Sequence, residues 1–246
     1  MPPVDAVVVA LLAPVAVAAG AIASVAGFGI GSLLTPLLTV RFGAAAAVTL
    51  VALPHALATA IRFARLRRFV DRPVLITFGI ASAAGGLVGA LAHAVLGSDI
   101  LAVVLGILLL FVGLGGLTGL TANLRFSGLW STVAGVASGV FGGLVGNQGG
   151  IRSAALLGTE LNREAFVATS TAIGLVVDAA RIPVYLATGG PTIVANLPIV
   201  GLAAVGVVVG TLLGEPVLRR IPEHRFRAVV SAILVALGIM LVAGVR

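Results

Sequence analysis

The sequence predicts an all-α polytopic membrane protein with two inverted-topology repeats, each made of a Gly-broken re-entrant hairpin and three spanning helices. The first observation is composition: 60% of the 246 residues are hydrophobic, 9% are charged and the mean hydropathy is +1.23. A soluble domain carries about 25% charged residues, so this chain has too few polar side chains to cover a water-facing globule. The other two observations are a Gly-rich cluster that occurs in both halves and an arginine distribution that alternates between them.

Apolar runs of spanning length follow one another along the chain with short polar breaks between them. A helix needs about 20 apolar residues to cross a bilayer core of about 30 Å, so eight crossings use about 160 residues and leave no room for a sizeable soluble domain. The runs cover 6–26, 44–61, 73–97, 100–120, 128–146, 165–186, 192–214 and 227–245.

Two shorter apolar pieces, 30–40 and 150–159, each follow a cluster of glycines, at 27–31 and 142–150. As helices of about 10 residues they cover about 15 Å, half the hydrocarbon thickness. Bare backbone at membrane depth is tolerated only where it is buried in protein or lines a wet cavity. Both clusters therefore predict broken helices or re-entrant hairpins.

The clusters belong to a repeat that divides the chain into two halves. An ungapped overlay of 27–63 on 146–182 places Gly27 on Gly146 and matches further identical residues along its length. Each half then has three full crossings and one hairpin, which enters and leaves the membrane on the same side. The number of crossings between equivalent points of the two halves is therefore odd, as inversion requires. The predicted units are 1–122, the first membrane repeat, and 123–246, the second, inverted membrane repeat.

The charge distribution orients these halves. All 15 basic residues are arginine, against 8 acids, and their position between apolar segments is explained by the positive-inside rule rather than by nucleic-acid binding. Five arginines lie in 62–72 but none in its second-half equivalent, 185–192, whereas 97–99 has none and 219–227 has four. If both Arg-rich segments face the cytoplasm, the halves insert upside down relative to each other and both termini lie outside the cytoplasm.

The few polar groups expected at membrane depth gather at the two clusters. In inverted-repeat transporters the substrate site lies where broken helices meet, with helix N-termini directed at anions. Glycine lets the chain adopt φ > 0 and lets a ligand approach the main-chain N–H groups, while amides, hydroxyls and an arginine replace the hydration of an oxyanion. The predicted substrate-binding residues are Gly27, Gly29, Gly31, Ser32, Thr35, Pro36, Gly146, Asn147, Gln148, Gly149, Gly150 and Arg152.

For several of these positions a packing or structural role stays open. Arg152 either balances the charge of an anion or pairs with Glu160 or extends to the membrane interface. Glycine in membrane helices also permits close helix packing, and this is the preferred interpretation for four further glycines. These are Gly85, Gly89, Gly206 and Gly210.

Candidate coupling or gating residues lie elsewhere in the chain. Asp178 and Arg181 are three residues apart on one helix face, so we expect an ion pair, with a proton relay or substrate contact as the alternative. His55 is a candidate proton carrier. Arg62 adjoins an Arg-rich segment and is expected at the interface. The three histidines share no helical face, so we predict no metal site.

Catalysis is not indicated by the sequence. It has no H-E-x-x-H, G-x-S-x-G or Walker A motif, and the cluster at 27–31 follows no strand, so it is not a dinucleotide-binding loop. An intramembrane enzyme needs paired ionisable groups at depth, and Asp178 has no second carboxylate near it in sequence. We therefore predict a protein that is not an enzyme and binds no cofactor.

The arrangement resembles the TauE/SafE family of sulfite and organosulfonate exporters. The resemblance rests on a Gly-rich break followed closely by Pro-Leu, as in AGFGIGSLLTPLL at 26–38, and on its copy GNQGGIRSAALL at 146–157. It covers nearly the whole chain. The second copy departs from the pattern, because Ala155 stands where the first has Pro36, and Arg152 lies in a stretch that is usually apolar or small.

The resemblance implies a multi-pass anion permease of the bacterial inner membrane. We expect a secondary transporter that exports sulfite, thiosulfate or an organosulfonate by alternating access at a midplane site between the broken helices. Its expected partners are the anion, the lipid bilayer and a coupling proton or cation, and a homo-oligomer stays open. A passive anion channel built on the same hairpins is the main alternative, and an intramembrane enzyme is less favoured.

Overall fold

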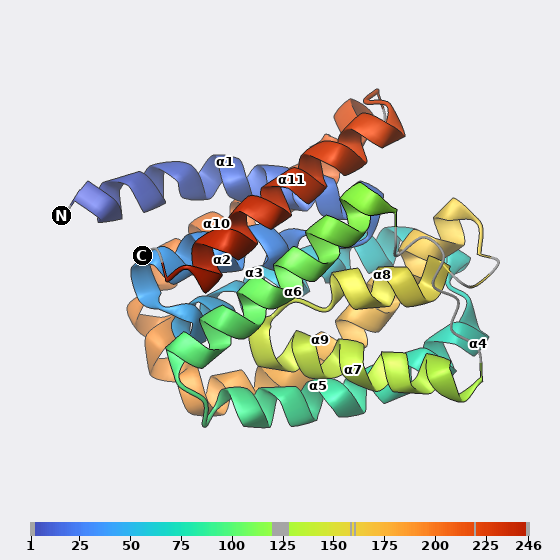
Figure 1. Ribbon diagram of the computed structural model, residues 1–246, viewed down its shortest axis with the longest axis horizontal. Helices are drawn as coiled ribbons and strands as arrows, with labels where there is room; N and C mark the ends of the chain where they lie inside the picture. The colour runs from blue at the N-terminus through green and yellow to red at the C-terminus, as the bar shows by residue number, and fades with distance from the viewer. Residues whose placement is uncertain (1–2, 120–127, 158, 160, 219, 245–246) are drawn as a thin grey trace.

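The computed structural model describes residues 3–119, 128–157, 159, 161–218 and 220–244, and this part of the chain contains helices and no strand (Figure 1). The first half forms α1 (Pro3–Ala26), α2 (Ile30–Phe42), α3 (Ala44–Leu66), η1 (Arg67–Phe69), α4 (Arg72–Val74), η2 (Leu75–Gly79), α5 (Ile80–His93) and α6 (Ser98–Thr118). The second half forms α7 (Leu129–Val145), α8 (Gly149–Leu157), α9 (Arg163–Ala195), α10 (Leu197–Leu218) and α11 (Glu223–Val242).

Seven segments of the described chain are long and apolar enough to cross a bilayer. The predicted number of full crossings, six, is one fewer than the seven segments of spanning length. The additional segment is in α1, which is expected from the sequence to be one arm of a hairpin but has an apolar stretch of spanning length at Ala6–Ala26. The predicted segment 128–146 corresponds to α7, which at 17 residues is shorter than a span. Large apolar side chains such as Val88 and Leu213 are exposed on the outside, as expected of a surface that faces lipid. The chain is a multi-pass membrane protein.

The longest helix, α9, differs from the prediction. Its 33 residues, about 50 Å of helix, continue through Pro183 and Pro191 to Ala195, so 185–192 is not a loop and the next helix begins at Leu197 instead of 192. The Gly-Gly-Pro sequence at 189–191 would end a helix in water. Inside a membrane protein an internal proline is tolerated, because neighbouring groups bond the carbonyl that it leaves free.

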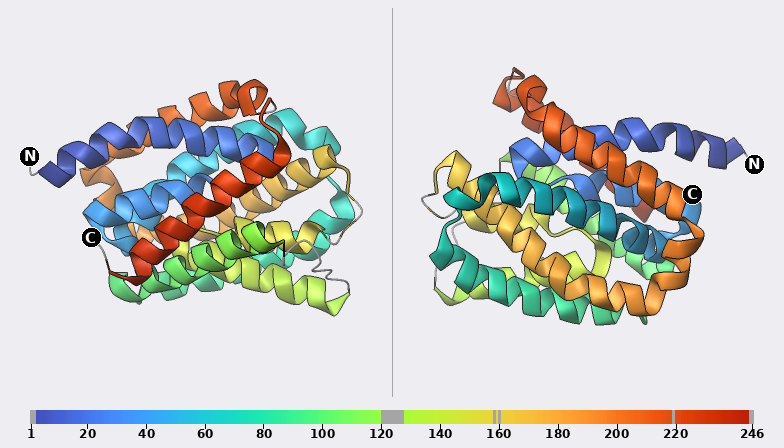
Figure 2. Two further views of the ribbon diagram at one scale, coloured as in Figure 1. Left: turned by 45° about the horizontal axis from the view of Figure 1, so that its top comes forward. Right: turned by 180° about the vertical axis from the view of Figure 1, so that it is seen from behind.

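The most extensive helix interfaces join the two halves of the chain. α1 packs along α10, α5 along α7, α3 along α9 and α6 along α11 (Figures 1 and 2). The predicted packing role of four glycines is confirmed at these interfaces. A Cβ at Gly85 or Gly89 would overlap the α7 backbone, and one at Gly206 or Gly210 would overlap α1.

Two buried breaks interrupt the helices at the predicted positions. We call residues 27–29, between α1 and α2, the first break, and residues 146–148, between α7 and α8, the second break. Gly27, Gly29 and Gly146 have φ values of 77°, 137° and 70°, a region that side chains other than glycine rarely adopt. These three glycines therefore allow the chain to leave one helix and start the next.

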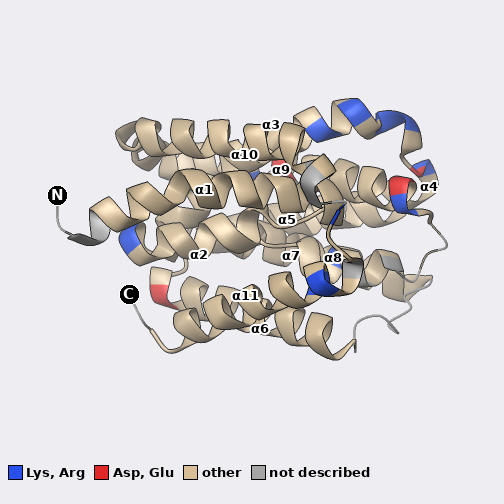
Figure 3. Ribbon diagram, turned by 90° about the horizontal axis from the view of Figure 1, so that it is seen from above, with Lys and Arg blue, Asp and Glu red and all other residues tan. Residues whose placement is uncertain are grey.

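The ends of the helix bundle differ in charge. Most of the arginine in Figure 3 lies at one end of the molecule, around the end of α3, α4 and the start of α11. The start of α1 and the end of α11 lie at the other end (Figures 1 and 3). The described parts of the two Arg-rich segments therefore lie at the same end of the molecule.

Candidate functional site

A buried polar face of α9 organises the site. Ser170 and Thr171 are fully buried, and each accepts a hydrogen bond from a guanidinium of another helix. Arg152 of α8 donates through Nε to Ser170 Oγ at 2.8 Å, and Arg62 of α3 donates through Nε to Thr171 Oγ1 at 2.9 Å. Consecutive residues of α9 therefore hold two cations from helices far apart in sequence.

The prediction that Arg62 is interfacial is wrong, because its side chain is only 4% exposed. Helix α3 continues beyond the predicted end at 61 to Leu66. Arg62 therefore lies on the same helical face as His55 and Thr59, which are seven and three residues earlier, and that face packs on α9.

Arg152 links the two breaks. Its side chain is 2% exposed, and one terminal NH2 group donates to the carbonyl oxygen of Gly27 in the first break at 3.1 Å. Carbonyls at a helix C-terminus carry partial negative charge and lack partners within the helix, which favours a cation there. The interpretation that Arg152 extends to the interface is wrong, and Glu160, its other suggested partner, lies outside the described residues.

The three candidate coupling residues form one cluster. The expected ion pair is confirmed: Arg181 Nε and one terminal nitrogen lie 2.9 and 2.7 Å from Asp178 Oδ1. His55 Nδ1 lies 2.7 Å from the other carboxylate oxygen, Oδ2. The carboxylate of Asp178 therefore joins α3 to α9.

Arg181 of this cluster also holds the end of α7, together with Tyr185 and His93. Arg181, Tyr185 and His93 each hydrogen-bond one carbonyl oxygen of residues 142–144, at 2.6 Å for Arg181 and 2.8 Å for His93. These carbonyls belong to the last turn of α7, where helical partners run out. Sequence reasoning did not single out Tyr185, because it lies at the end of the predicted apolar run 165–186 and no motif includes it.

The two breaks touch each other directly. Ser32 Oγ, in the first turns of α2, donates to Asn147 Oδ1 of the second break at 3.1 Å. A Cβ at Gly31 would overlap the carbonyl oxygen of Gly146, so only glycine permits this approach. The structure thus brings together predicted site residues from the two halves of the chain.

Not every predicted glycine opens the backbone. Gly149 and Gly150 are not among the glycines with positive φ, and a Cβ on them would overlap the side chains of Phe28 and Val112. Both glycines therefore make room for neighbouring side chains. Pro36 is buried inside α2 and brings no polar atom to the site.

Buried polar atoms without a hydrogen-bond partner concentrate around the breaks. Within the described part of the chain, those found belong to α2, α3, the second break and α8, and all but Gln148 Oε1 can donate a hydrogen bond. Native structures leave few such atoms, so a group of them needs an explanation. They are Thr35 Oγ1, Thr59 Oγ1, Arg62 NH1, Asn147 Nδ2, Gln148 Nε2 and Oε1, Arg152 NH1 and Ser153 Oγ.

The buried charges do not balance. Among the described residues, the buried cations Arg62, Arg152 and Arg181 face the single buried carboxylate of Asp178, which leaves a formal charge of +2. Buried charge at membrane depth is costly unless it is paired. Excess positive charge together with unpartnered donors suits the binding of an anion.

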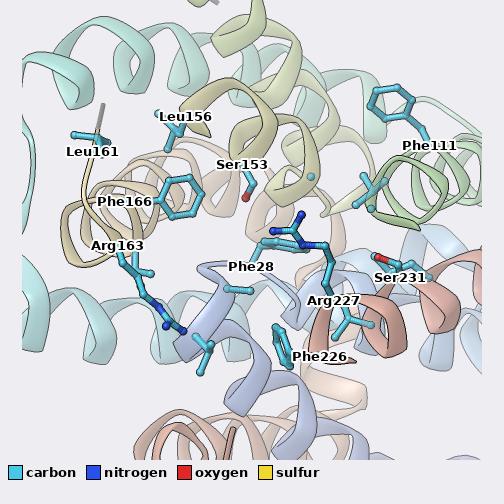
Figure 4. A pocket seen from close by; sticks show the side chains of 18 of the residues that line it. Phe28, Phe111, Ser153, Leu156, Leu161, Arg163, Phe166, Phe226, Arg227 and Ser231 are labelled. Atoms are coloured by element: carbon cyan, nitrogen blue, oxygen red, sulfur yellow. The ribbon is translucent and has the colours of Figure 1, made fainter. Parts of the chain in front are cut away.

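A cavity of about 410 Å³ adjoins the breaks. Phe28 of the first break and Ser153 of α8 line it, with Arg163 and Arg227 among its other polar residues (Figure 4). The remaining wall is mostly aromatic and aliphatic. Phe226 and Arg227, near the start of α11, and Phe28 of the first break all line the cavity, so it lies between the start of α11 and the breaks.

Comparison with known proteins identifies a family. A family model described as sulfite exporter TauE/SafE matches residues 12–241, nearly the whole chain, and the match includes both breaks and all the buried charges. The resemblance found in the sequence is thereby confirmed. No curated protein and no solved structure matches the chain.

Proposed function

The chain belongs to the sulfite exporter TauE/SafE family, and from this membership we propose that it is a secondary transporter that exports a small sulfur oxyanion. The candidates are sulfite, thiosulfate and organosulfonates. The observation that carries the proposal is the cluster of buried, unpartnered donors around the breaks, which bears a formal charge of +2. In such a cluster an oxyanion gains charge-assisted hydrogen bonds in place of its water shell.

We further propose that the halves 1–122 and 123–246 are inverted repeats. Continued toward both ends, with a two-residue gap that places Gly85 and Gly89 on Gly206 and Gly210, the sequence overlay makes α1, α3, α5 and α6 the equivalents of α7, α9, α10 and α11. On this correspondence the α1–α10 interface is equivalent to α7–α5, and the α3–α9 and α6–α11 interfaces each join a helix to its own equivalent. A two-fold relation between the halves produces such reciprocal pairing.

Inverted repeats support alternating access around the breaks. In this mechanism one half rocks against the other, and the site opens first to one side of the membrane and then to the other. Arg152 donates through one terminal NH2 group to the Gly27 carbonyl, a bond that crosses between the halves, while its other terminal group, NH1, is unpartnered. An anion bound at NH1 would therefore share its guanidinium with a contact between the halves that must move.

The cluster of Asp178, Arg181 and His55 supplies the proposed coupling site. Arg181 hydrogen-bonds both Asp178 and a carbonyl oxygen at the end of α7, just before the second break. A change in the charge of the His55–Asp178 pair would therefore change the strength of the contact that positions this break. Proton uptake at this pair would give the transporter a coupling ion.

Sulfite flux in proteoliposomes tests the proposed site. Arg152→Gln should lower the initial rate by about tenfold or more, because a charged partner worth about 1.5–3 kcal/mol is lost. Asn147→Ala with Gln148→Ala should act in the same direction. The control is Arg65→Gln, which removes an exposed arginine from α3 and should leave the rate within about twofold.

Unchanged flux in both site variants would contradict the assignment. Counterflow separates a transporter from a passive channel, because only a carrier exchanges labelled for unlabelled sulfite against a gradient with saturable kinetics. Linear, unsaturable flux without counterflow would replace alternating access by a channel.

A further inference from the structure

Arg62 and Thr59 are buried polar residues that no sequence motif singled out as part of an anion site. Both lie on the α3 face that packs on α9, one helical turn apart. Arg62 NH1 and Thr59 Oγ1 have no hydrogen-bond partner among the described residues. Neither side chain is exposed by more than 4%, so bulk water does not serve these atoms.

The facing surface of α9 brings Arg152 to the same place. Gly174 lies one turn after Thr171, the residue that holds Arg62. A Cβ added at Gly174 would lie 3.2 Å from Arg152 NH1 and 3.7 Å from the methyl group of Thr59. Arg152 NH1 also lacks a partner. Arg152 NH1 and the side chain of Thr59 therefore border the side of α9 that Gly174 keeps free of a side chain, one turn from Thr171, which holds Arg62.

The hydrogen-bond partners of Arg62 and Arg152 distinguish these residues from the coupling cluster of Asp178, Arg181 and His55. Asp178, with His55 facing it, lies one turn beyond Gly174 and is already bonded to Arg181 on one carboxylate oxygen and to His55 on the other. Arg62 and Arg152 bond only neutral hydroxyl or carbonyl oxygens in the contacts found. The formal charge of +2 thus resides on these two guanidinium groups.

We propose that Arg62 and Arg152, with Thr59 beside them, bind the two negative charges of a dianionic oxyanion and make the transporter select dianions over monoanions. The inference rests on the proposed function and specifies its substrate class. A dianion neutralises both cations, whereas a monoanion leaves one buried cation uncompensated, which is costly at membrane depth. Arg62 is then the residue that determines charge selectivity.

Binding of two probe anions to the purified full-length protein tests this inference. Thiosulfate carries two negative charges and methanesulfonate one, and both present oxygens on a tetrahedral sulfur. Each is titrated while thermal stability is recorded, since an anion that binds the folded state raises the apparent Tm by mass action. The wild-type protein should bind thiosulfate at least about tenfold more tightly than methanesulfonate.

Arg62→Gln keeps a donor but removes the charge, so it should weaken thiosulfate binding by about tenfold and leave methanesulfonate within about threefold. Arg62→Lys should keep the preference for thiosulfate. Arg65→Gln, an exposed position on the same helix, is the matched control and should change neither affinity. If Arg62→Gln does not fold, Thr59→Val removes one donor without changing charge and should weaken thiosulfate binding more than methanesulfonate binding.

Equal affinity of the wild-type protein for both anions would overturn the inference, and so would an Arg62→Gln or Thr59→Val variant that weakens both anions equally. In those cases, anion binding that is weakened by substitution of Arg152 or Asn147 would still support the proposed transport function. A wild-type protein that binds neither these anions nor sulfite would reject the proposed function itself.

Discussion

Asp178 illustrates how much a single residue can determine in this molecule. It is the one buried carboxylate of the described chain, and both of its oxygens are bonded, one to Arg181 and the other to His55. Arg181 in turn holds a carbonyl oxygen at the end of α7. The position of the second break therefore depends on a residue in the middle of α9.

Neutralising this residue should destabilise the protein strongly. Asp178→Asn leaves Arg181 buried without its counter-charge, and breaking a buried pair from one side costs about 3–5 kcal/mol. We expect the Tm of the purified protein to fall by about 10 °C. The control Glu164→Gln removes an exposed carboxylate from the start of the same helix and should shift the Tm by less than about 2 °C. Equal Tm values for the two variants would contradict the structural role of Asp178.

The two broken helical units, α1–α2 and α7–α8, are the elements on which the site depends. Their breaks are possible because glycine occupies the positions with positive φ, and they meet because Gly31 lets α2 approach the backbone of the second break. The contact between Ser32 and Asn147 lies at this crossing. A small change in the distance between the two units would therefore displace polar residues of the site, such as Ser32 and Asn147.

A single methyl group should separate these elements. Gly31→Ala places a Cβ where it overlaps the carbonyl oxygen of Gly146, and overpacking of this kind costs about 1–3 kcal/mol. We expect a lower Tm and a loss of sulfite flux. Gly201→Ala is the control, because its Cβ meets no atom within 4 Å and α10 is helical there. Full flux in Gly31→Ala would show that the breaks need not touch for transport.

The whole molecule has one arginine-rich end, formed by segments that lie far apart in the sequence. The end of α3, α4 and the start of α11 all lie at that end, although they belong to different halves (Figure 3). Cytoplasmic loops carry an excess of arginine, so this end is predicted to face the cytoplasm. The equivalent ends of α3 and α9 would then lie on opposite sides of the membrane, as inverted repeats require.

The absence of cysteine from the sequence makes this orientation directly measurable. Arg68→Cys and Arg225→Cys should react with a membrane-impermeant thiol reagent only from the cytoplasmic side. Gly97→Cys and Ala195→Cys, at exposed positions of the opposite end, should react only from the outside. Labelling of Arg68→Cys and Ala195→Cys from the same side would refute the inverted arrangement.

Sequence reasoning predicted much of the fold but only part of the site. Hydrophobic runs and glycine clusters have local causes, so the helices and both breaks were placed within a few residues, whereas the end of α9 was missed because Gly-Gly-Pro at 189–191 breaks helices only in water. The roles of Arg62, Thr59 and Tyr185 were not predictable from neighbouring residues. Each role depends on which helix packs opposite the residue. Tyr185 and its hydrogen-bond partner Gly143, for example, are 42 residues apart in sequence.

The sequence by itself determined that the chain crosses a membrane, where its backbone breaks and which family it belongs to, because apolar length, glycine spacing and composition are properties of contiguous segments. Only the tertiary structure decided which charges meet. The packing of α3 on α9 converted scattered residues into an ion-pair cluster around Asp178 and a pair of guanidinium groups at Ser170 and Thr171. Charge pairing depends on distances of a few ångströms between helices, and those distances are fixed by packing rather than by any local pattern.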